Sequence, residues 1–425
     1  MANDLLYGLL PSHLLLGLIA LLMLLEVLRA SERWARVAVI AVMVAALVAL
    51  AHQAGAGYGA PIVPGEIEID ALSLFGKAVL LACGLGLAVG FPGAGGSRFW
   101  LLAACSILGG LVILDSAGFA SLFMGVELLS LPAFALVVHG RGGGVASEGA
   151  FKYLVLSSVA SALMLLGISL AYGATGSLAI ATWAPLLAQG GAHARATGVL
   201  VLGGLFLKAA VFPFHGWAPD AYASARMPVT ALLATVVKAA VVLALVRIVA
   251  AQPLDPTSAA IVTALALASI FFGNLAALGQ RRFKRLLAYS SVAHAGYMIF
   301  ALLDTTGQRT GDLLWYTAFY ALATLLACAA YELLCPGDDD DLAALDGKFA
   351  QRPFAALLLG FAMLSLAGLP PFPGFFAKVF VFRSVVASDQ LAPAVAAFAG
   401  SFLGLTYYLG IVLRLFRTHV QRRPA

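Results

Sequence analysis

Two apolar segments interrupted by proline decide the fold: LKAAVFPFHGWAP at residues 207–219 and SLAGLPPFPGFFAK at residues 365–378. Each carries a lysine five residues from a proline, with Lys208 before Pro213 and Lys378 after Pro373. Proline removes a backbone donor and kinks or splits a helix. In lipid, the freed carbonyls must face protein or water. Interrupted helices in corresponding positions of two halves indicate a transporter-like fold built from inverted repeats.

The composition around these segments is that of a helical membrane protein. Of 425 residues, 62% are hydrophobic and 11% are charged, and the mean hydropathy is +0.99. A soluble protein carries about twice that charged fraction. Repeated apolar runs of about 17–25 residues predict spanning helices, because a membrane barrel would show shorter alternating stretches. We therefore predict an all-α polytopic membrane protein.

We predict thirteen spans, near residues 10–30, 35–52, 69–91, 99–114, 116–139, 150–172, 196–219, 227–251, 256–279, 284–303, 312–335, 353–387 and 391–416. Sixteen of the 25 Lys and Arg residues fall in loops on one side, here called the arginine-rich end; four fall on the opposite side and five inside spans. The positive-inside rule then predicts a periplasmic N-terminus and a cytoplasmic C-terminus. The acidic run 338–341 falls in a loop at the arginine-rich end, and we interpret it as solvated.

Five lysines stand inside the predicted spans: Lys77, Lys152, Lys208, Lys238 and Lys378. An ammonium group in a membrane helix is costly, so such residues are rare and mark ion or proton pathways by default. Burial disfavours the charged form of a lysine, which brings proton exchange towards neutral pH. Together with the carboxylate of Glu127 in its own apolar run, the series predicts that the chain moves protons or cations.

Other chemistries lack a signature in this sequence. The four cysteines form no CxxC pair, the seven histidines form no HExxH motif, and no Rossmann or Walker glycine loop is present. We therefore predict no metal site and no cofactor in this chain. We also predict no nucleic-acid binding, because the net charge of +5 comes from the loops on one side. Redox chemistry would therefore belong to another chain.

An ordered series of motifs resembles the antiporter-like, proton-translocating membrane subunits of respiratory complex I, the NADH-quinone oxidoreductase. Within this family the chain looks most like the subunit N group, which includes mitochondrial subunit 2. The matching segments are GVELLSLPAFAL (125–136), FKYLVLSSVASALMLLGISLAYGATGS (151–177), FLKAAVFPFHGWAPDAY (206–222), MPVTALLATVVKAA (227–240), GNLAALGQRRFKRLLAYSSVAHAGYM (273–298) and LSLAGLPPFPGFFAKVFVF (364–382). Family members usually have fourteen spans, one more than we predict here.

The resemblance implies a proton relay of seven residues: Glu127, Lys152, Lys208, Lys238, Lys284, His294 and Lys378. Glu127 and Lys208 would form an ion pair that works as a switch, because losing the carboxylate lets a lysine deprotonate. Lys238 would lie midway, and Lys378 would feed the exit. Lys152 would tune the pair or line the proton uptake path. A lysine rather than a glutamate at 378 favours the subunit N group.

The resemblance also implies an N-terminal three-helix segment (1–95) followed by two inverted five-helix repeats (96–251 and 252–425). The implied location is the bacterial inner membrane, in contact with lipid, neighbouring antiporter-like subunits and small membrane subunits. Flavin, iron–sulfur clusters and quinone would be held by partner subunits. The whole assembly would be a proton-translocating enzyme of the respiratory chain.

Several alternatives stay open at this point. The chain can instead be an Mrp-type Na⁺/H⁺ antiporter subunit of the same fold, or a structural subunit that has lost pumping. Glu127 and Lys208 can be a static ion pair, although such pairs rarely recover their desolvation cost. Lys284 in RRFKR can be a charged anchor at the membrane surface, and Lys77 matches no strong motif.

Overall fold

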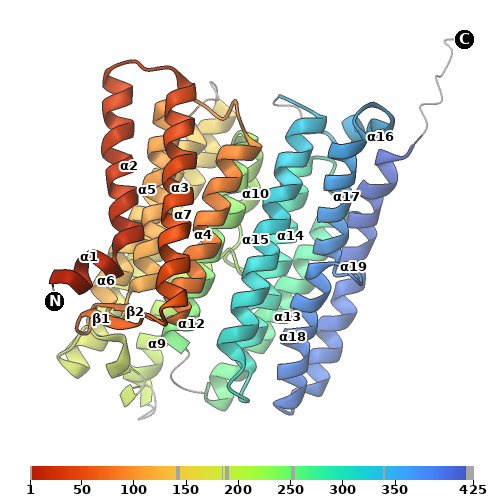
Figure 1. Ribbon diagram of the computed structural model, residues 1–425. Coiled ribbons are helices and arrows are strands. Elements are labelled where there is room, and N and C mark those ends of the chain that lie inside the picture. Colours follow the sequence, from red (N-terminus) through yellow and green to blue (C-terminus); the bar gives the residue numbers. More distant parts are fainter. Residues whose placement is uncertain are drawn as a thin grey trace, which may run out of the picture.

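The computed structural model describes residues 2–139, 144–183, 185–186, 191–249, 254–337 and 340–417. Long helices run side by side, from the N-terminal α2 and α3 on one flank to the C-terminal α19 on the other (Figure 1). The predicted all-α polytopic architecture is confirmed. In the described part of the chain, eleven helices are long and apolar enough to cross a membrane, and the two interrupted spans bring the number to thirteen.

The bounds of the elements follow the predicted spans closely. The N-terminal part contains α1 (Ala2–Gly8), α2 (Leu10–Val27), α3 (Glu32–Gly55), β1 (Ala60–Val63), β2 (Ile67–Ile69) and α4 (Ala71–Gly90). The next part contains α5 (Ser97–Asp115), α6 (Phe119–Val138), α7 (Gly144–Thr175), η1 (Ile180–Thr182), α9 (Gly191–Lys208), α10 (Trp217–Ser224), α11 (Met227–Leu232), η2 (Leu233–Val237) and α12 (Lys238–Val249). The last part contains α13 (Pro256–Leu278), α14 (Phe283–Phe300), η3 (Ala301–Leu303), α15 (Arg309–Leu334), η4 (Leu342–Leu345), α16 (Lys348–Gln351), α17 (Pro353–Ala367), α18 (Pro373–Ala387) and α19 (Leu391–Leu415).

A short hairpin that the sequence analysis did not predict lies between α3 and α4. Strands β1 and β2 pair antiparallel, with Ala60 opposite Ile69. Gly65 has a φ of 76°, a conformation that suits glycine, and makes the turn. The hairpin leads directly to Asp70, whose carboxylate accepts a hydrogen bond of 2.8 Å from the backbone of Ser73 and caps α4.

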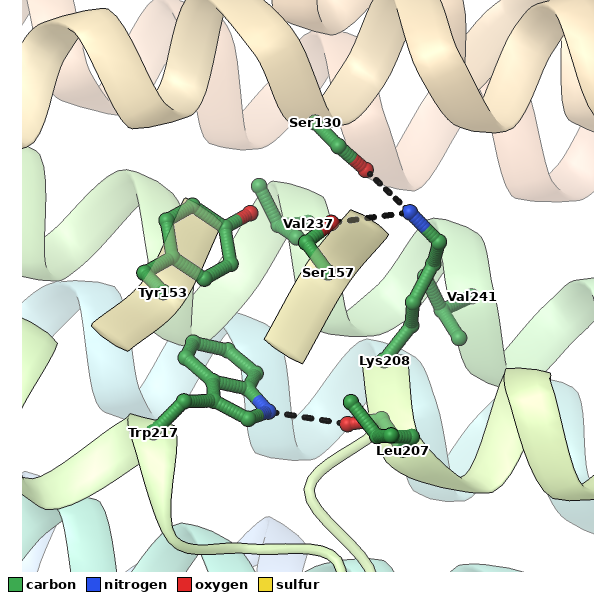
Figure 2. Close-up of a pocket in the computed structure, with 8 residues that line it drawn as sticks. All are labelled: Ser130, Tyr153, Ser157, Leu207, Lys208, Trp217, Val237 and Val241. Atoms are coloured by element: carbon green, nitrogen blue, oxygen red, sulfur yellow. Dashed lines mark hydrogen bonds between the residues drawn. The ribbon is translucent and has the colours of Figure 1, made fainter. Parts of the chain in front are cut away.

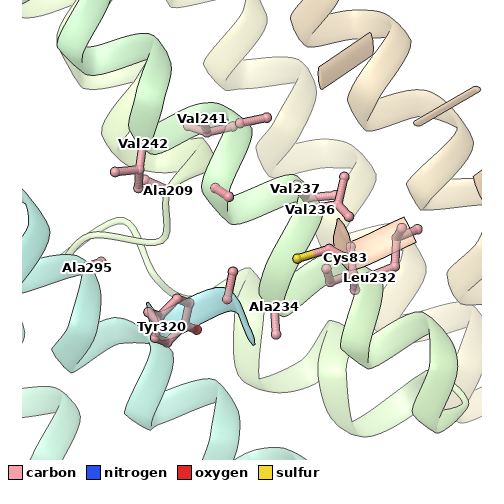
Figure 3. Close-up of a cluster of buried hydrophobic side chains, with 14 of the residues drawn as sticks. Cys83, Ala209, Leu232, Ala234, Val236, Val237, Val241, Val242, Ala295 and Tyr320 are labelled. Carbon is pink, nitrogen blue, oxygen red and sulfur yellow. The ribbon is translucent and has the colours of Figure 1, made fainter. Parts of the chain in front are cut away.

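The most deeply buried spans are α11–η2–α12 and α14, which are buried in the chain along almost their whole length. Leu233–Val237 form a π-helical turn directly before Lys238. Such turns are rare and often lie at functional sites. Figure 3 shows apolar side chains of this region meeting Cys83 of α4, Ala295 of α14 and Tyr320 of α15. Lys238 therefore lies in the protein interior and not at the lipid surface.

The first interruption follows Lys208, the last residue of α9. The chain runs irregularly through 209–216 before α10 begins at Trp217. The freed backbone groups find protein partners, as membrane burial requires. The indole of Trp217 donates to the carbonyl of Leu207 at 2.8 Å, and Ser269 accepts from the amide of Phe212 at 3.0 Å. The interruption predicted from the prolines is present and is built into the core.

The second interruption separates α17 from α18. Gly368 ends α17 in a left-handed conformation with a φ of 79°. The hydroxyl of Ser365 accepts from the amide of Gly374 at 3.1 Å, and the ammonium of Lys378 donates to the carbonyl of Ala367 at 2.9 Å. A positive charge at a helix C-terminus is favourable because the carbonyl ends are partly negative. This interruption is also present as predicted.

Candidate functional site

The centre of the first half is the contact between α6 and α9. The ammonium nitrogen of Lys208 lies 3.4 Å from Oε1 of Glu127. It also donates to the hydroxyls of Ser130 at 3.1 Å and Ser157 at 2.9 Å. The Lys208 side chain is 4% exposed and that of Glu127 is 27% exposed. Ser161 of α7 donates to the same carboxylate oxygen. The predicted ion pair is therefore formed, within a ring of hydroxyls.

A small cavity adjoins Lys208. Its lining includes Ser130, Tyr153, Ser157, Lys208 and Trp217, so hydroxyls and the ammonium group face the same space (Figure 2). Trp217, the first residue of α10, forms part of its wall. A cavity with this many polar partners suits an ordered water, which can carry a proton between fixed groups.

Lys238 is held by neutral oxygens of α14. Its ammonium donates to the backbone carbonyl of Ser291 at 2.5 Å and to the Ser291 hydroxyl at 2.6 Å. The Tyr222 hydroxyl lies 3.5 Å from the same serine hydroxyl. The lysine is 3% exposed. A buried lysine that is bound by neutral groups has little to hold its charge, which suits a group that gains and loses a proton.

The next serine continues the line towards the second half. Ser290 and Tyr408 of α19 share a short hydrogen bond. Tyr408 lies 3.2 Å from Nε2 of His294, and the Tyr316 hydroxyl lies 2.9 Å from Nδ1. Lys238 and His294 therefore both lie near hydroxyls of α14, Ser291 beside the lysine and Ser290, through Tyr408, beside the histidine. A histidine held by two phenols can change tautomer by exchanging protons with them.

Lys378 ends this line. Its ammonium lies 5.0 Å from the centre of the Tyr297 ring. That ring in turn lies 6.0 Å from the His294 ring. A second small cavity, lined by His294, Ser365 and Gly374 among others, borders the interruption beside this lysine. Each interruption therefore lies close to a buried lysine and to a small cavity lined by apolar side chains and a few polar groups.

Two predicted site residues lie away from this line, at the arginine-rich end. Lys152 lies 2.7 Å from carboxylate oxygens of both Glu148 and Asp220. The ammonium of Lys284 donates to the carbonyl of Ala225 at 2.8 Å. Lys152 thus joins α7 to α10 through Asp220, a contact that the sequence analysis did not identify. Lys284 is buried at 2% exposure and ties α14 to the end of α10.

The interpretation of the acidic run as solvated is wrong for Asp340, whereas Asp341 is exposed as predicted. Asp340 is only 2% exposed and lies 2.7 Å from a guanidinium nitrogen of Arg282. It also accepts from the backbone amide of Lys284 at 3.2 Å, so it anchors the start of α14. A run of aspartates suggests a solvated loop. The local sequence does not show that Arg282 pairs with Asp340, which is buried. Residues 338 and 339 lie outside the described residues.

A second buried ion pair was also missed. Lys77 of α4 lies 2.8 Å from Asp115 at the end of α5, with side chains 0% and 3% exposed. Ser73 donates to the same carboxylate. Nearby, Arg247 of α12 binds both oxygens of Asp70, at 2.6 and 3.0 Å. The cluster joins α4, α5 and α12 at the end opposite the arginine-rich one. Asp115 falls between the spans predicted at 99–114 and 116–139 and was assigned to neither.

The line of groups is suited to proton transfer. Lysine, histidine and hydroxyl groups can each release one proton and accept another, whereas the intervening helices exclude bulk water. Within the described residues, no three His, Cys, Asp or Glu side chains gather as a metal site.

Comparisons with known proteins place this geometry in a family. The transmembrane family described as NADH:quinone oxidoreductase/Mrp antiporter matches residues 116–404. NADH-quinone oxidoreductase subunit N of Pelobacter propionicus is 53% identical over 422 residues, which cover 99% of this chain and 91% of the relative. NADH-quinone oxidoreductase subunit 14 of Thermus thermophilus is 40% identical, covering 84% of this chain and 80% of the relative.

Solved structures agree with these relatives. A chain of respiratory complex I from Thermus thermophilus with bound aureothin matches with a TM-score of 0.85 and 35% identity, covering 98% of this chain and 90% of that chain. A chain of the Mrp complex from Dietzia also has a TM-score of 0.85, with 24% identity and coverage of 96% and 81%, which shows a shared fold alone. The predicted resemblance is confirmed: this chain belongs to the NADH-quinone oxidoreductase subunit N family.

Proposed function

We propose that this chain is a proton-translocating membrane subunit of an NADH-quinone oxidoreductase. The observation that carries the proposal is the buried pair Glu127–Lys208 at an interrupted helix, joined to a hydroxyl-lined cavity. Intramembrane charges of this kind mark transport pathways. Quinone reduction in partner subunits would supply the energy, and flavin and iron–sulfur clusters would also belong to those partners.

Protons would pass along the polar line from the first interruption to the second. With Glu127 close, Lys208 keeps its charge; when the carboxylate moves away, Lys208 loses a proton towards Lys238. Ser291, Ser290 and Tyr408 provide hydroxyls between Lys238 and His294. His294 would then exchange with Lys378, beside the second cavity, for release on the far side.

The placement of the chain in the membrane is part of the proposal. The arginine-rich end would face the cytoplasm of a bacterium, following the positive-inside rule. Residues 96–251 and 252–425 would form two inverted repeats, each containing one interrupted span, after an N-terminal segment of residues 1–95. The boundary at 251–252 lies outside the described residues. Neighbouring antiporter-like subunits, small membrane subunits and lipid would cover the outer surfaces. Lys152 and Lys284 would act at the cytoplasmic side.

The test is the variant Lys208→Ala in the assembled complex, reconstituted in proteoliposomes. We expect proton pumping to be nearly abolished and quinone reduction to be lowered, because the group that both receives and releases the proton is gone. Lys348→Ala is the matched control, since Lys348 is a partly exposed lysine of α16 whose ammonium donates to its own helix neighbour Gln351 at 3.3 Å. Normal pumping by an assembled Lys208→Ala complex contradicts the proposal. Pumping that requires Na⁺ would favour an antiporter function instead.

A further inference from the structure

A charged cluster at the arginine-rich end contains Lys152 and also a carboxylate, Asp220, to which the relay described so far gives no role. Asp220 of α10 is its centre. One carboxylate oxygen lies 2.7 Å from the ammonium of Lys152, and the other lies 3.3 Å from a guanidinium nitrogen of Arg285. Lys152 also contacts Glu148, at 2.7 Å. The aspartate therefore joins α10 to α7 on one side and to α14 on the other.

The position of Asp220 links bulk water to the interruption. Its side chain is 30% exposed, so it contacts solvent. It lies four residues into α10, the helix that begins immediately after the first interruption. Gly149 allows α7 to approach this helix closely, because a Cβ there would lie 2.8 Å from the backbone oxygen of Asp220. The carboxylate is thus fixed at one place against α7.

Polar groups lead from this cluster to Lys208. Ser157 of α7 accepts from the Lys208 ammonium at 2.9 Å. It lies five residues beyond Lys152, or about 7.5 Å along a helix axis. The lining of the cavity beside Lys208 includes Tyr153, next to Lys152, and Trp217, three residues before Asp220 (Figure 2). The cavity and its hydroxyls therefore lie on the Lys208 side of these two aromatic residues, whose chain neighbours carry the Asp220 cluster.

We propose that Asp220 is the group through which the Lys208 site takes up protons from the arginine-rich side. This inference rests on the proposed function. A proton from water binds a carboxylate oxygen, and the neutral acid loosens its hold on Lys152 and Arg285. The proton then passes through the cavity to the neutral amine of Lys208, which becomes an ammonium. Asp220 is ionised again, re-forms both ion pairs and closes the path.

The charges that face Asp220 set this behaviour. Glu148 and Lys152 face it from α7, and Arg285 faces it from α14. Lys284 on α14 is bound to the carbonyl of Ala225, just beyond α10. Two cations contact the carboxylate at rest, so both ion pairs must open when a proton binds it.

The competing explanation is a static brace between three helices, and a double variant separates the two. Removing one partner of an ion pair leaves an uncompensated charge, whereas removing both is often close to neutral. We expect Asp220→Asn to lose pumping to the extent that Lys208→Ala does, in proteoliposomes containing the whole complex. The double variant Arg285→Met with Asp220→Asn, which leaves Lys152 paired with Glu148, should stay equally defective. Restored pumping in the double variant would show a brace and overturn the inference.

Asp346→Asn is the matched control. Asp346 lies at the same end, is 27% exposed and pairs with Arg414 at 3.2 Å and Arg417 at 3.7 Å, and neither arginine belongs to the proposed relay. It should pump normally. If Asp220→Asn pumps as well as Asp346→Asn while Lys208→Ala does not, the uptake role is wrong and the proposed function stands.

If Asp220→Asn does not assemble, Asp220→Glu provides the test, because it keeps the charge. We expect the assembled variant to show a shifted pH at which pumping falls to half, relative to wild type and to Asp346→Glu. An unchanged pH profile would overturn the inference. Normal pumping by Lys208→Ala in the same series would instead contradict the proposed function, on which this inference rests.

Discussion

Lys378 donates a hydrogen bond of 2.9 Å to the carbonyl oxygen of Ala367, so a residue of α18 completes the end of α17 across the interruption. Lys208 has a different relationship to its own interruption. It is the last residue of α9, and its partners are the carboxylate of Glu127 and two serine hydroxyls. The first lysine therefore has an anionic partner and the second has a neutral one. This difference suits a relay in which Lys208 holds its positive charge and Lys378 releases its proton.

Lys378→Ala should abolish pumping with little loss of stability. The variant loses a hydrogen bond from a charged group, worth about 1.5–3 kcal/mol, but it also removes the cost of burying an ammonium. Lys378→Arg should pump weakly, because the planar guanidinium differs in shape and does not release its proton. The measurement is protons pumped per electron in proteoliposomes. Two variants that pump like wild type would exclude Lys378 from the relay.

Glu127→Gln should weaken pumping, and Glu127→Asp should weaken it less. Glutamine keeps the shape but loses the charge that holds Lys208 protonated. Aspartate keeps the charge on a chain shorter by one methylene. Ser161→Ala is the control, because Ser161 donates to the same carboxylate without carrying charge. A Glu127→Gln complex that pumps at the wild-type rate would show that the ion pair is no switch.

Lys77 and Asp115 should be coupled strongly in stability. Lys77→Met alone leaves a buried carboxylate without its partner and should destabilise the subunit by about 3–5 kcal/mol. The double variant Lys77→Met with Asp115→Leu should be close to wild type or more stable. Thermal denaturation of the detergent-solubilised complex measures both. If the stability loss of the double variant equals the sum of the two single losses, the 2.8 Å contact is not an energetically coupled pair.

The sequence predicted the features that depend on local pattern. Prolines inside apolar runs located both interruptions. Lysines inside spans located Lys208 and Lys238, which the structure buries among polar groups. These signals are strong because a membrane tolerates few breaks and few charges. The predicted spans match the helices for the same reason.

The sequence could not predict which helix ends meet. Asp115 and Asp220 each follow an apolar or proline-containing stretch, so both looked like ordinary loop or helix-end residues. Their importance comes from Lys77 and Lys152, which lie 38 and 68 positions away in the chain and reach them only after packing. One signal was present: every intramembrane lysine needs a partner, and a search for carboxylates at span ends would have found both. The π-helical turn before Lys238 carries no comparable signal.

Lys238→Met should separate function from stability most clearly. Lys238 is buried at 3% exposure, and the oxygens that bind its ammonium are those of Ser291. Replacing a buried charge by an apolar side chain of similar length is often neutral or stabilising by about 1–4 kcal/mol. Ser291 keeps local partners, since the Tyr222 hydroxyl lies 3.5 Å from its hydroxyl. The variant complex should therefore melt at or above the wild-type temperature and yet pump no protons.

A packing residue would behave in the opposite way. If Lys238 served only to hold α12 against α14, its loss would lower the melting temperature and leave pumping per electron unchanged in the complexes that remain assembled. Lys348→Met controls for loss of a lysine at a partly exposed site and should alter neither quantity. Melting temperature and protons pumped per electron, measured on one preparation, thus decide between the two roles. If the Lys238→Met complex is stable but does not pump, methionine replaces the stabilising contribution of the lysine. The wild-type ammonium is then needed for proton transfer.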